Sequence, residues 1–288
     1  RPDGIIEGKS LQKLITTPLP PSEHDYPFKG LQDKLHGIRY QELTTITSGS
    51  GQGKSTFCRQ LAVNLLTKGE RVGYLALEES NRRTALGLMS TAVGKSLHIG
   101  EHERTDLEEY FRDTIANWNL YLFDGFGSFD PQLIYNRIEY LASGLECRII
   151  FLDHLSILLS GLDGDERRTI DITMTRLRSL VERTGISLFL VSHLRRSNDR
   201  TSHEEGGKVS LSQLRGSAGI AQLSDQVIGI ERNQQSETER DIATLRIIKN
   251  RYSGETGFAG KIKFNLETSR FTDHETETTP IFNPTTDF

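Results

Sequence analysis

The sequence has few cysteines and no long hydrophobic run. Its only cysteines are Cys58 and Cys147, and neither has the spacing of a metal ligand. We expect both to be reduced packing residues in a cytosol-like compartment. No apolar run approaches the ~20 residues of a membrane-spanning helix, and the start lacks the basic-then-apolar pattern of a secretory signal. We therefore expect a soluble chain with no membrane partner.

A general excess of positive charge is also missing. Lys and Arg number 35 against 39 Asp and Glu, a formal net charge of -4. A surface that is basic all over is excluded, so any contact with a nucleic-acid backbone must be concentrated in a local stripe. The 288 residues, 35% hydrophobic and 26% charged, suffice for one large globular domain, although two are possible.

One loop has the composition of a phosphate-binding cradle. Glycines let backbone N–H groups turn toward phosphates at φ values that side chains forbid. Lys54 would contact the β- and γ-phosphates, and the Ser55 hydroxyl would bind Mg²⁺. The alternative is an accidental Gly/Ser-rich turn, and Ser48 stands where the motif usually has glycine. The loop is Ser48, Gly49, Ser50, Gly51, Gln52, Gly53, Lys54, Ser55 and Thr56.

Short β-branched runs alternate with helical patterns along the chain. The runs predict strands at residues 43–47, 72–77, 120–123, 149–153, 187–192, 226–231, 243–249 and 261–265. Helical spacing is clearest at Ile170, Met174, Leu177 and Val181. The pattern predicts an α/β fold with a mostly parallel, buried sheet, finished by several strands without intervening helices.

Three predicted strands end in polar residues, where a parallel sheet binds its ligands. Asp153 is the candidate to hold Mg²⁺ opposite Ser55, although it could also be a helix N-cap. Glu78 is the candidate general base for the attacking water, with Glu79 structural. Alternatively, both glutamates begin the next helix, whose dipole favours carboxylates. His193 could hydrogen-bond the γ-phosphate or be a structural group.

Basic and polar residues follow His193 directly. A mobile basic loop beside a nucleotide-sensing residue could couple hydrolysis to movement of a phosphate backbone. The alternative is a solvated surface loop of mixed charge. The residues concerned are Arg195, Arg196, Asn198 and Arg200, and further along Arg215, Gly216 and Ser217.

Two cations, Lys249 and Arg251, alternate at the end of a late strand. In a ring of ATPases, such residues reach the neighbour's γ-phosphate and neutralise the charge that develops there. Within one chain they could instead pair with acids or bind a phosphate backbone. The sequence leaves these possibilities open.

The first 27 residues differ from the rest. Leu11, Leu14 and Ile15 form a short apolar stripe, and the proline-rich residues 16–21 cannot continue a helix. This segment is either a linker remnant or an arm that docks on a neighbouring subunit. A chain that opens on Arg1 suggests a processed product, an excised fragment or one half of a longer polypeptide.

Taken together, the motifs resemble the helicase half of the T7-type phage primase-helicases, with the mitochondrial replicative helicase as a more distant relative. The segments that carry the resemblance are residues 48–56, 77–80, 150–156, 165–167, 203–206, 214–217, 222–225 and 231–235. The resemblance implies a RecA-like P-loop NTPase core. It further implies a hexameric or heptameric ring that encircles single-stranded DNA, hydrolyses ATP or dTTP with Mg²⁺ at subunit interfaces, and moves 5′ to 3′.

The resemblance also assigns roles to residues. It makes Lys54 and Ser55 the phosphate and Mg²⁺ ligands, Asp153 the metal-side acid, Glu78 the catalytic base and His193 the γ-phosphate sensor. Arg251 matches an arginine finger acting in trans, with Lys249 beside it. Arg232 and Phe264 match positions that flank the nucleotide base, and Gln222 is grouped with the nucleotide-binding residues. The two basic segments match loops that face DNA in the central channel.

By the same resemblance, residues 1–27 are an interdomain linker whose helix packs on the adjacent subunit, and residues 28–271 are the RecA-like domain. Residues 272–288 are a flexible acidic tail, ending in Phe288, that docks on the replicative DNA polymerase. No primase chemistry is visible, so a priming half would precede Arg1. The expected location is the cytoplasm of an infected bacterial host.

Two other classes of protein share these features. A recombinase of the same fold would bind DNA as an open filament and exchange strands. A non-catalytic, NTP-gated loader or scaffold would bind nucleotide and DNA without turnover, and it would be indifferent to loss of the Glu78 carboxylate.

Overall fold

The computed structural model describes residues 7–16, 22–125, 130–156, 166–194, 205–214 and 218–274. Its centre is one nine-stranded sheet with the order β3-β2-β4-β5-β1-β6-β7-β8-β9. The strands are β1 (Leu43–Ser48), β2 (Val72–Ala76), β3 (Leu120–Leu122), β4 (Ile149–Asp153), β5 (Ser187–His193), β6 (Gln226–Arg232), β7 (Ile242–Asn250), β8 (Gly257–Asn265) and β9 (Arg270–His274). Neighbouring strands from β3 to β6 are parallel, and those from β6 to β9 are antiparallel.

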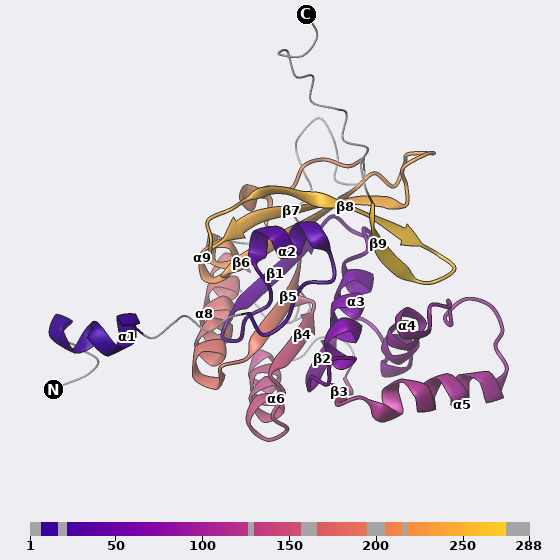
Figure 1. Ribbon diagram of the computed structural model, residues 1–288, viewed down its shortest axis with the longest axis horizontal. Helices are drawn as coiled ribbons and strands as arrows, with labels where there is room; N and C mark the ends of the chain where they lie inside the picture. The colour runs from indigo at the N-terminus through magenta and orange to yellow at the C-terminus, as the bar shows by residue number, and fades with distance from the viewer. Residues whose placement is uncertain are drawn as a thin grey trace, which may run out of the picture.

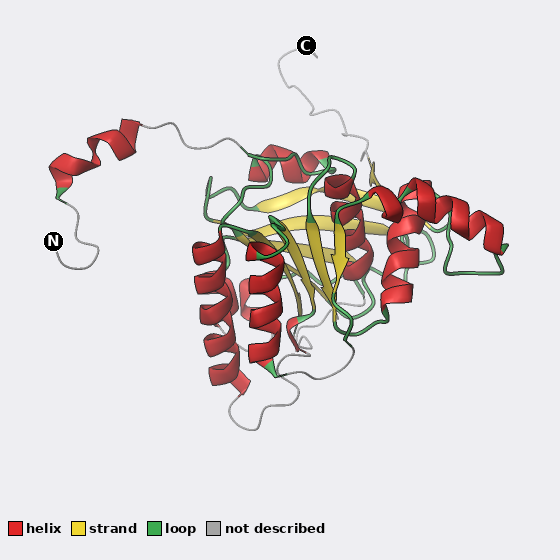
Figure 2. Cartoon of the chain, turned by 90° about the horizontal axis from the view of Figure 1, so that it is seen from below, coloured by secondary structure: helices red, strands yellow, loops and turns green. Residues whose placement is uncertain are grey.

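Helices cover the parallel part of the sheet on both faces (Figures 1 and 2). The helical elements are η1 (Gly8–Leu11), α1 (Gln12–Thr16), α2 (Lys29–Leu35), α3 (Lys54–Leu66), α4 (Asn81–Val93), α5 (Arg104–Asp113), η2 (Ile115–Asn117), α6 (Pro131–Ser143), α8 (Glu166–Thr184), η3 (Leu211–Gln213) and α9 (Ala218–Leu223). Helices α2 and α3 contribute to one core cluster, and α6, α8 and α9 contribute to the other.

Burial on both faces explains why the parallel strands read as continuous apolar runs. In β4, Phe151 belongs to the core on the α3 face, whereas Ile150 and Leu152 belong to the core on the α8 face. A strand buried on both sides shows no alternation of polar and apolar residues. On the α3 face, the rings of Tyr74, Phe151 and Phe189 stack across three adjacent strands, with centroids 5.3 and 4.8 Å apart.

The antiparallel part of the sheet has one buried face only. Along β7, Ala243, Leu245 and Ile247 are buried, whereas Thr244 and Arg246 between them lie on the other face, with Arg246 partly exposed. Such alternation is typical of antiparallel strands with one solvated side. The prediction that the last strands follow one another without intervening helices is confirmed by β6 to β9.

Local signals set the helix boundaries. Helix α4 begins after Ser80, whose hydroxyl accepts a hydrogen bond from the backbone N–H of Arg83, and it ends at Gly94 in the left-handed conformation. Helix α6 begins with Asp130 as N-cap and Pro131 in the first turn. These residues mark the first turn of both helices and the end of α4.

All eight predicted strands are present, within a few residues of their predicted ends. Strand β9 was not predicted, because four of its five residues, Arg270, Thr272, Asp273 and His274, are polar. Only Phe271 is buried there.

Cys58 and Cys147 are free and buried, which agrees with the prediction of packing residues. Burial raises the pKa of both thiols, to about 11 for Cys147. Among the described residues, no helix is both long and apolar enough to cross a membrane.

Helix α2 lies against the backbone of β8, and the contact depends on a missing side chain. A Cβ atom added to Gly30 would be 2.0 Å from the carbonyl oxygen of Ala259, and the Cα of Gly30 is 3.9 Å from where a Cβ on Gly260 would be. We expect Gly30→Ala to lower the free energy of unfolding by about 1–3 kcal/mol, because a backbone must shift to admit the methyl group. Urea unfolding measures this change.

The control for this variant is Gly8→Ala, whose added Cβ meets no atom within 4 Å. Like Gly30→Ala, it reduces the conformational entropy of the unfolded chain, but it adds no steric clash. Equal stability of the two variants would contradict the packing of α2 on β8.

Candidate functional site

The cradle predicted from sequence joins the carboxyl end of β1 to the start of α3. Gly51 and Gly53 have φ values of 70° and 97°, a region that side chains strongly disfavour. Gly53 is the N-cap of α3, and Lys54 is its first residue. The loop therefore surrounds a helix N-terminus, whose unpaired N–H groups and dipole bind phosphate.

The end of β6 braces this loop from the side. The Gln52 side-chain carbonyl accepts a hydrogen bond from the N–H of Gly49 (3.2 Å), and its amide donates to the Arg232 carbonyl (3.1 Å). The Gln234 amide donates to the Ser50 carbonyl (3.3 Å). These hydrogen bonds fix the loop against the end of β6.

Lys54 is buried inside the cradle. Its ammonium donates to the carbonyl of Gly49 (2.8 Å) and to the carbonyl and hydroxyl of Ser48 (3.3 and 3.1 Å). Burial lowers the pKa of Lys54 to about 8, and the carboxylate of Asp153 opposes this shift. Among the described residues, the ammonium donates to neutral oxygens, which a phosphate can replace.

Ser55 and Asp153, the predicted Mg²⁺ ligands, lie close together beside the lysine. Asp153 ends β4 and is 8% exposed, and it hydrogen-bonds the Ser55 side chain. Burial raises the pKa of Asp153, while the Ser55 hydrogen bond and nearby His154 oppose the shift. A hydroxyl and a carboxylate side by side are the hard oxygen ligands that Mg²⁺ prefers, so these residues fit that ion.

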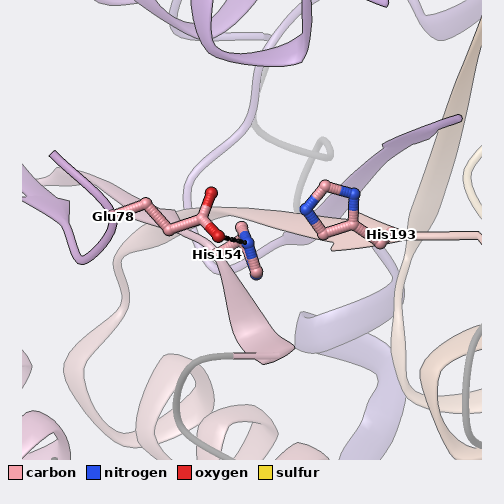
Figure 3. Close-up of side chains that lie close together, drawn as sticks. All are labelled: Glu78, His154 and His193. Carbon is pink, nitrogen blue, oxygen red and sulfur yellow. Dashed lines mark ion pairs between the residues drawn. The ribbon is translucent and has the colours of Figure 1, made fainter. Parts of the chain in front are cut away.

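Glu78 and Glu79 follow β2 and turn in different directions. Glu79 lies in an ion pair with Arg59, with oxygens 2.5 and 2.6 Å from Nη2, and accepts a hydrogen bond from Thr84 (2.8 Å). The Glu78 side chain is 54% exposed and faces the ends of β4 and β5 (Figure 3). Both precede the N-cap of α4, so neither lies in its first turn.

Two histidines lie next to Glu78 (Figure 3). Nε2 of His154 is 2.6 Å from Oε1 of Glu78, and the rings of His154 and His193 are perpendicular with centroids 4.1 Å apart. His193 was predicted from the sequence to be the γ-phosphate sensor, and no role was predicted for His154. Its position directly after Asp153 was the available signal.

Arg251 and Lys249 lie at the other end of the sheet. Nη1 of Arg251 is 2.8 Å from Asp225, which also pairs with Arg178 and accepts a hydrogen bond from the N–H of Leu43. The Lys249 ammonium donates to three carbonyls at the end of α9, at 2.6, 3.0 and 2.7 Å. Both cations therefore lie near the amino end of β1.

The separation between these cations and the cradle follows from β1 itself. The strand runs from Leu43, bonded to Asp225, to Ser48, where the cradle begins, so it separates them by about 16 Å at ~3.3 Å per residue. Within one chain, Arg251 does not approach the cradle of its own β1.

The remaining predicted nucleotide residues are divided between these two ends. The Arg232 carbonyl contacts the cradle through Gln52, while its guanidinium donates to the Arg240 carbonyl. The rings of Phe264 and Phe271 pack together with their centroids 5.1 Å apart, and the Phe271 ring lies beside Gly53. Gln222 lies on α9, where its carbonyl accepts from Lys249 and Arg251, away from the cradle.

The predicted DNA-binding residues Arg195, Arg196, Asn198, Arg200, Arg215, Gly216 and Ser217 lie outside the described residues, as does Phe288. The residues that flank them are described. Leu194 and Leu214 form an antiparallel bridge at the end of β5, directly after His193. The described residues that precede the two segments, Leu194 and Leu214, therefore lie together next to His193.

The fold and this site define a class. A mostly parallel sheet that carries a phosphate cradle after β1 and an acid at the end of β4 is a RecA-like P-loop NTPase core. The model of the DnaB-like helicase C-terminal domain family matches residues 25–273, and the chain belongs to that family.

Individual relatives agree with this assignment. The DNA helicase/primase of Enterobacteria phage T3 is 36% identical over 284 residues, which cover 93% of this chain and 49% of that protein. A probable plasmid replicative DNA helicase of Chlamydia trachomatis is 28% identical over 255 residues, 85% of this chain and 53% of that protein. The chain spans about half the length of these relatives. The resemblance to phage primase-helicases predicted from the motifs is confirmed.

Solved structures match in fold at low sequence identity. One of them, an isolated ATPase domain, has a TM-score of 0.74 at 18% identity and covers 93% of this chain and 96% of that one. A DnaB-like replicative helicase, described with its interactions with primase, has a TM-score of 0.75 at 18% identity and covers 93% of this chain and 67% of that one. The predicted fold class is therefore confirmed.

The contacts of Glu79 predict a structural defect when they are removed. We expect Glu79→Gln to lower the free energy of unfolding by about 1–3 kcal/mol, because Arg59 would keep a mostly buried charge without its carboxylate. Nucleotide affinity should stay within a few-fold. Thermal unfolding and titration with a fluorescent nucleotide measure the two quantities.

Glu146→Gln is a matched control, since it removes the same charge from an exposed ion pair with Arg71. Exposed pairs contribute about 0–1 kcal/mol. If both variants were equally stable, Glu79 would not have the structural role assigned here.

Proposed function

We propose that this chain is the motor domain of an NTP-driven replicative DNA helicase, with ATP or dTTP as substrate. The observation that carries the proposal is the separation along β1 between the cradle and the cation pair of Lys249 and Arg251. A cradle in one copy and a cation pair in another complete a site that neither copy contains alone. Membership of the DnaB-like helicase family supports the same conclusion.

Each residue of the cradle has a separate task. Lys54 exchanges its contacts with Ser48 and Gly49 for the β- and γ-phosphates. Ser55 and Asp153 hold Mg²⁺, which neutralises phosphate charge when bound. Phe264 and Arg232 flank the nucleotide base from β8 and β6.

Hydrolysis uses the residues at the ends of β2 and β5. Glu78 takes a proton from the attacking water, since its side chain is half exposed and faces the ends of β4 and β5. His193 senses the γ-phosphate. Arg251 of the neighbouring copy neutralises charge as it develops on the transferred phosphoryl group, with Lys249 and Gln222 on the same surface.

The basic segments after Leu194 and Leu214 bind the backbone of single-stranded DNA. The bridge between Leu194 and Leu214, next to His193, supports coupling between loss of the γ-phosphate and movement of DNA. Arg195, Arg196, Asn198 and Arg200 belong to one loop, and Arg215, Gly216 and Ser217 to the other. Translocation is 5′ to 3′ through a hexameric or heptameric ring.

Exposed apolar residues at two places support subunit packing in such a ring. Ile15 of α1 is 74% exposed, and Phe111 is 48% exposed on α5, a helix with no buried residue.

The linker whose helix packs on the adjacent copy ends before His24 rather than at residue 27, because His24 pairs with Ile38 and Tyr26 is buried in the core, and the motor extends to His274. The acidic tail that docks on the replicative DNA polymerase at the fork begins after His274 rather than at residue 272, because Thr272, Asp273 and His274 pair with β8 in the sheet, and it ends in Phe288. The protein acts in the host cytoplasm.

The test is the NTP hydrolysis rate per subunit as a function of protein concentration, with and without single-stranded DNA. We expect the rate to rise with concentration and to increase further with DNA, because sites form only between copies. A low rate independent of both would mean self-contained sites and would contradict the proposal. Strand displacement on a forked duplex then separates a helicase from a recombinase, which would pair homologous strands instead.

The role of Arg251 predicts a trans effect. We expect Arg251→Ala to lower hydrolysis by about 10³-fold or more while nucleotide affinity stays within a few-fold, because an arginine finger acts on the transition state. Mixing it with Lys54→Ala subunits should restore part of the activity, since some interfaces then combine an intact cradle with an intact arginine.

Arg71→Ala is the control, because the contacts described for Arg71 are with Leu145 and exposed Glu146 and not with the cradle or Asp225. It should leave hydrolysis unchanged. Loss of nucleotide affinity in Arg251→Ala, or no recovery on mixing, would assign Arg251 to its own chain's site.

A further inference from the structure

His154 is a buried polar residue at the active end of the sheet, and the proposed mechanism does not use it. It is 4% exposed and follows Asp153 at the end of β4. Its ring lies between Glu78 and His193, which come from the ends of β2 and β5 (Figure 3). It therefore contacts both the candidate base and the candidate sensor.

The backbone fixes which nitrogen of His154 carries the proton. The N–H of Ser156 donates to Nδ1 at 3.1 Å, so Nδ1 presents a lone pair. In the neutral imidazole the proton must then be on Nε2. This is the nitrogen that lies 2.6 Å from Oε1 of Glu78.

Nε2 of His154 and Oε1 of Glu78 are close enough for a hydrogen bond, but their geometry is not that of one. Nε2 makes no other hydrogen bond to the described residues. Glu78 is half exposed, so its carboxylate can rotate onto the N–H without disturbing the core. Catalytic hydrogen bonds are commonly loose before substrate binds and tighten in the complex.

A metal ion is the other occupant that these side chains suggest. Ligand atoms of Glu78, His154 and His193 all lie within 4.8 Å of one another. A histidine binds metal through a nitrogen lone pair, however, and the Ser156 hydrogen bond leaves the proton on Nε2. The tautomer therefore favours donation to Glu78 over metal binding.

We propose that His154 is a positioning residue whose Nε2–H holds one oxygen of the Glu78 carboxylate, so that the other faces the attacking water. The perpendicular contact with His193 joins the base to the sensor, since a shift of one ring displaces the other. This inference rests on the proposed function, in which Glu78 is the general base.

Positioning matters here because a free glutamate side chain samples several rotamers. A misplacement of about 1 Å in a reacting group can cost about 100-fold in rate. A structural role for His154 would instead change folding stability and leave the chemical step alone.

The experiment compares His154→Phe, which keeps a ring but has no donor, with His154→Gln, which keeps an N–H donor at the ε position. We expect His154→Phe to lower kcat by about 10–100-fold with KM and nucleotide-analogue affinity within about 3-fold. His154→Gln should recover at least about 5-fold of that loss. Thermal unfolding with bound analogue verifies that both variants fold. If folded Phe and Gln variants were equally slow, or if KM rather than kcat changed, the proposal would be overturned.

A double-mutant cycle with Glu78→Gln separates this proposal from the assignment of the base. We expect Glu78→Gln to slow single-turnover hydrolysis strongly, and His154→Phe to slow it by less than about 2-fold further in that background. If Glu78→Gln were as fast as the parent, the assignment of Glu78 as base would fail. If it were slow and His154→Phe had the same effect in both backgrounds, only the positioning role would fail.

Equilibrium dialysis with Zn²⁺ tests the metal alternative. The parent and His154→Phe should bind the same amount. Stoichiometric Zn²⁺ on the parent that His154→Phe loses would make His154 a ligand and overturn the proposal. Glu79→Gln is the control in the kinetic assays, because it removes the adjacent carboxylate, which does not contact His154 in the described contacts, and should leave kcat within about 2-fold.

Discussion

The central position of β1 is the constraint on which the rest of this arrangement depends. The strand is paired on both sides, by β5 and β6, and buried on both faces, so it cannot bend or slip without loss of core contacts. Its carboxyl end carries the cradle, and its amino end is bonded to Asp225, which holds Arg251. An extended strand of fixed length therefore keeps the phosphate site and the cation pair apart. The separation favours an assembly in which neighbouring copies complete each other's sites.

Buried partners decide what each charged residue near the cradle can do. Glu78 and Glu79 are adjacent in sequence, yet one faces the ends of β4 and β5 and the other is held by Arg59. Lys54 is held by oxygens that a phosphate can replace, and Arg251 keeps half of its side chain exposed beside Asp225, whereas Arg178 is mostly buried against the same carboxylate. The groups with replaceable or exposed contacts are the ones proposed to act on the substrate. The groups with saturated charge pairs hold the frame.

Much of the fold was predictable because the relevant signals are local. A run such as residues 149–153, apolar at every position except the last, indicates a strand buried on both faces, and the glycines of the cradle indicate a turn around phosphate. Strand β9 was not predicted because four of its five residues are polar, and it is pairing with β8 that places them in the sheet. No individual role was predicted for Phe271, Gln234, Asp225 and His154, because their roles come from contacts with residues distant in the chain.

The sequence by itself determined the phosphate cradle, the acid that faces it and the two-sided burial of the sheet, since each depends on residue types at short spacing. It left undecided whether Arg251 serves its own chain or a neighbour's, and whether Glu78 acts as a base or, with Glu79, only begins the next helix. Only the tertiary structure decided where these side chains lie, because strand order and long-range ion pairs, rather than spacing along the chain, fix their distance from the cradle.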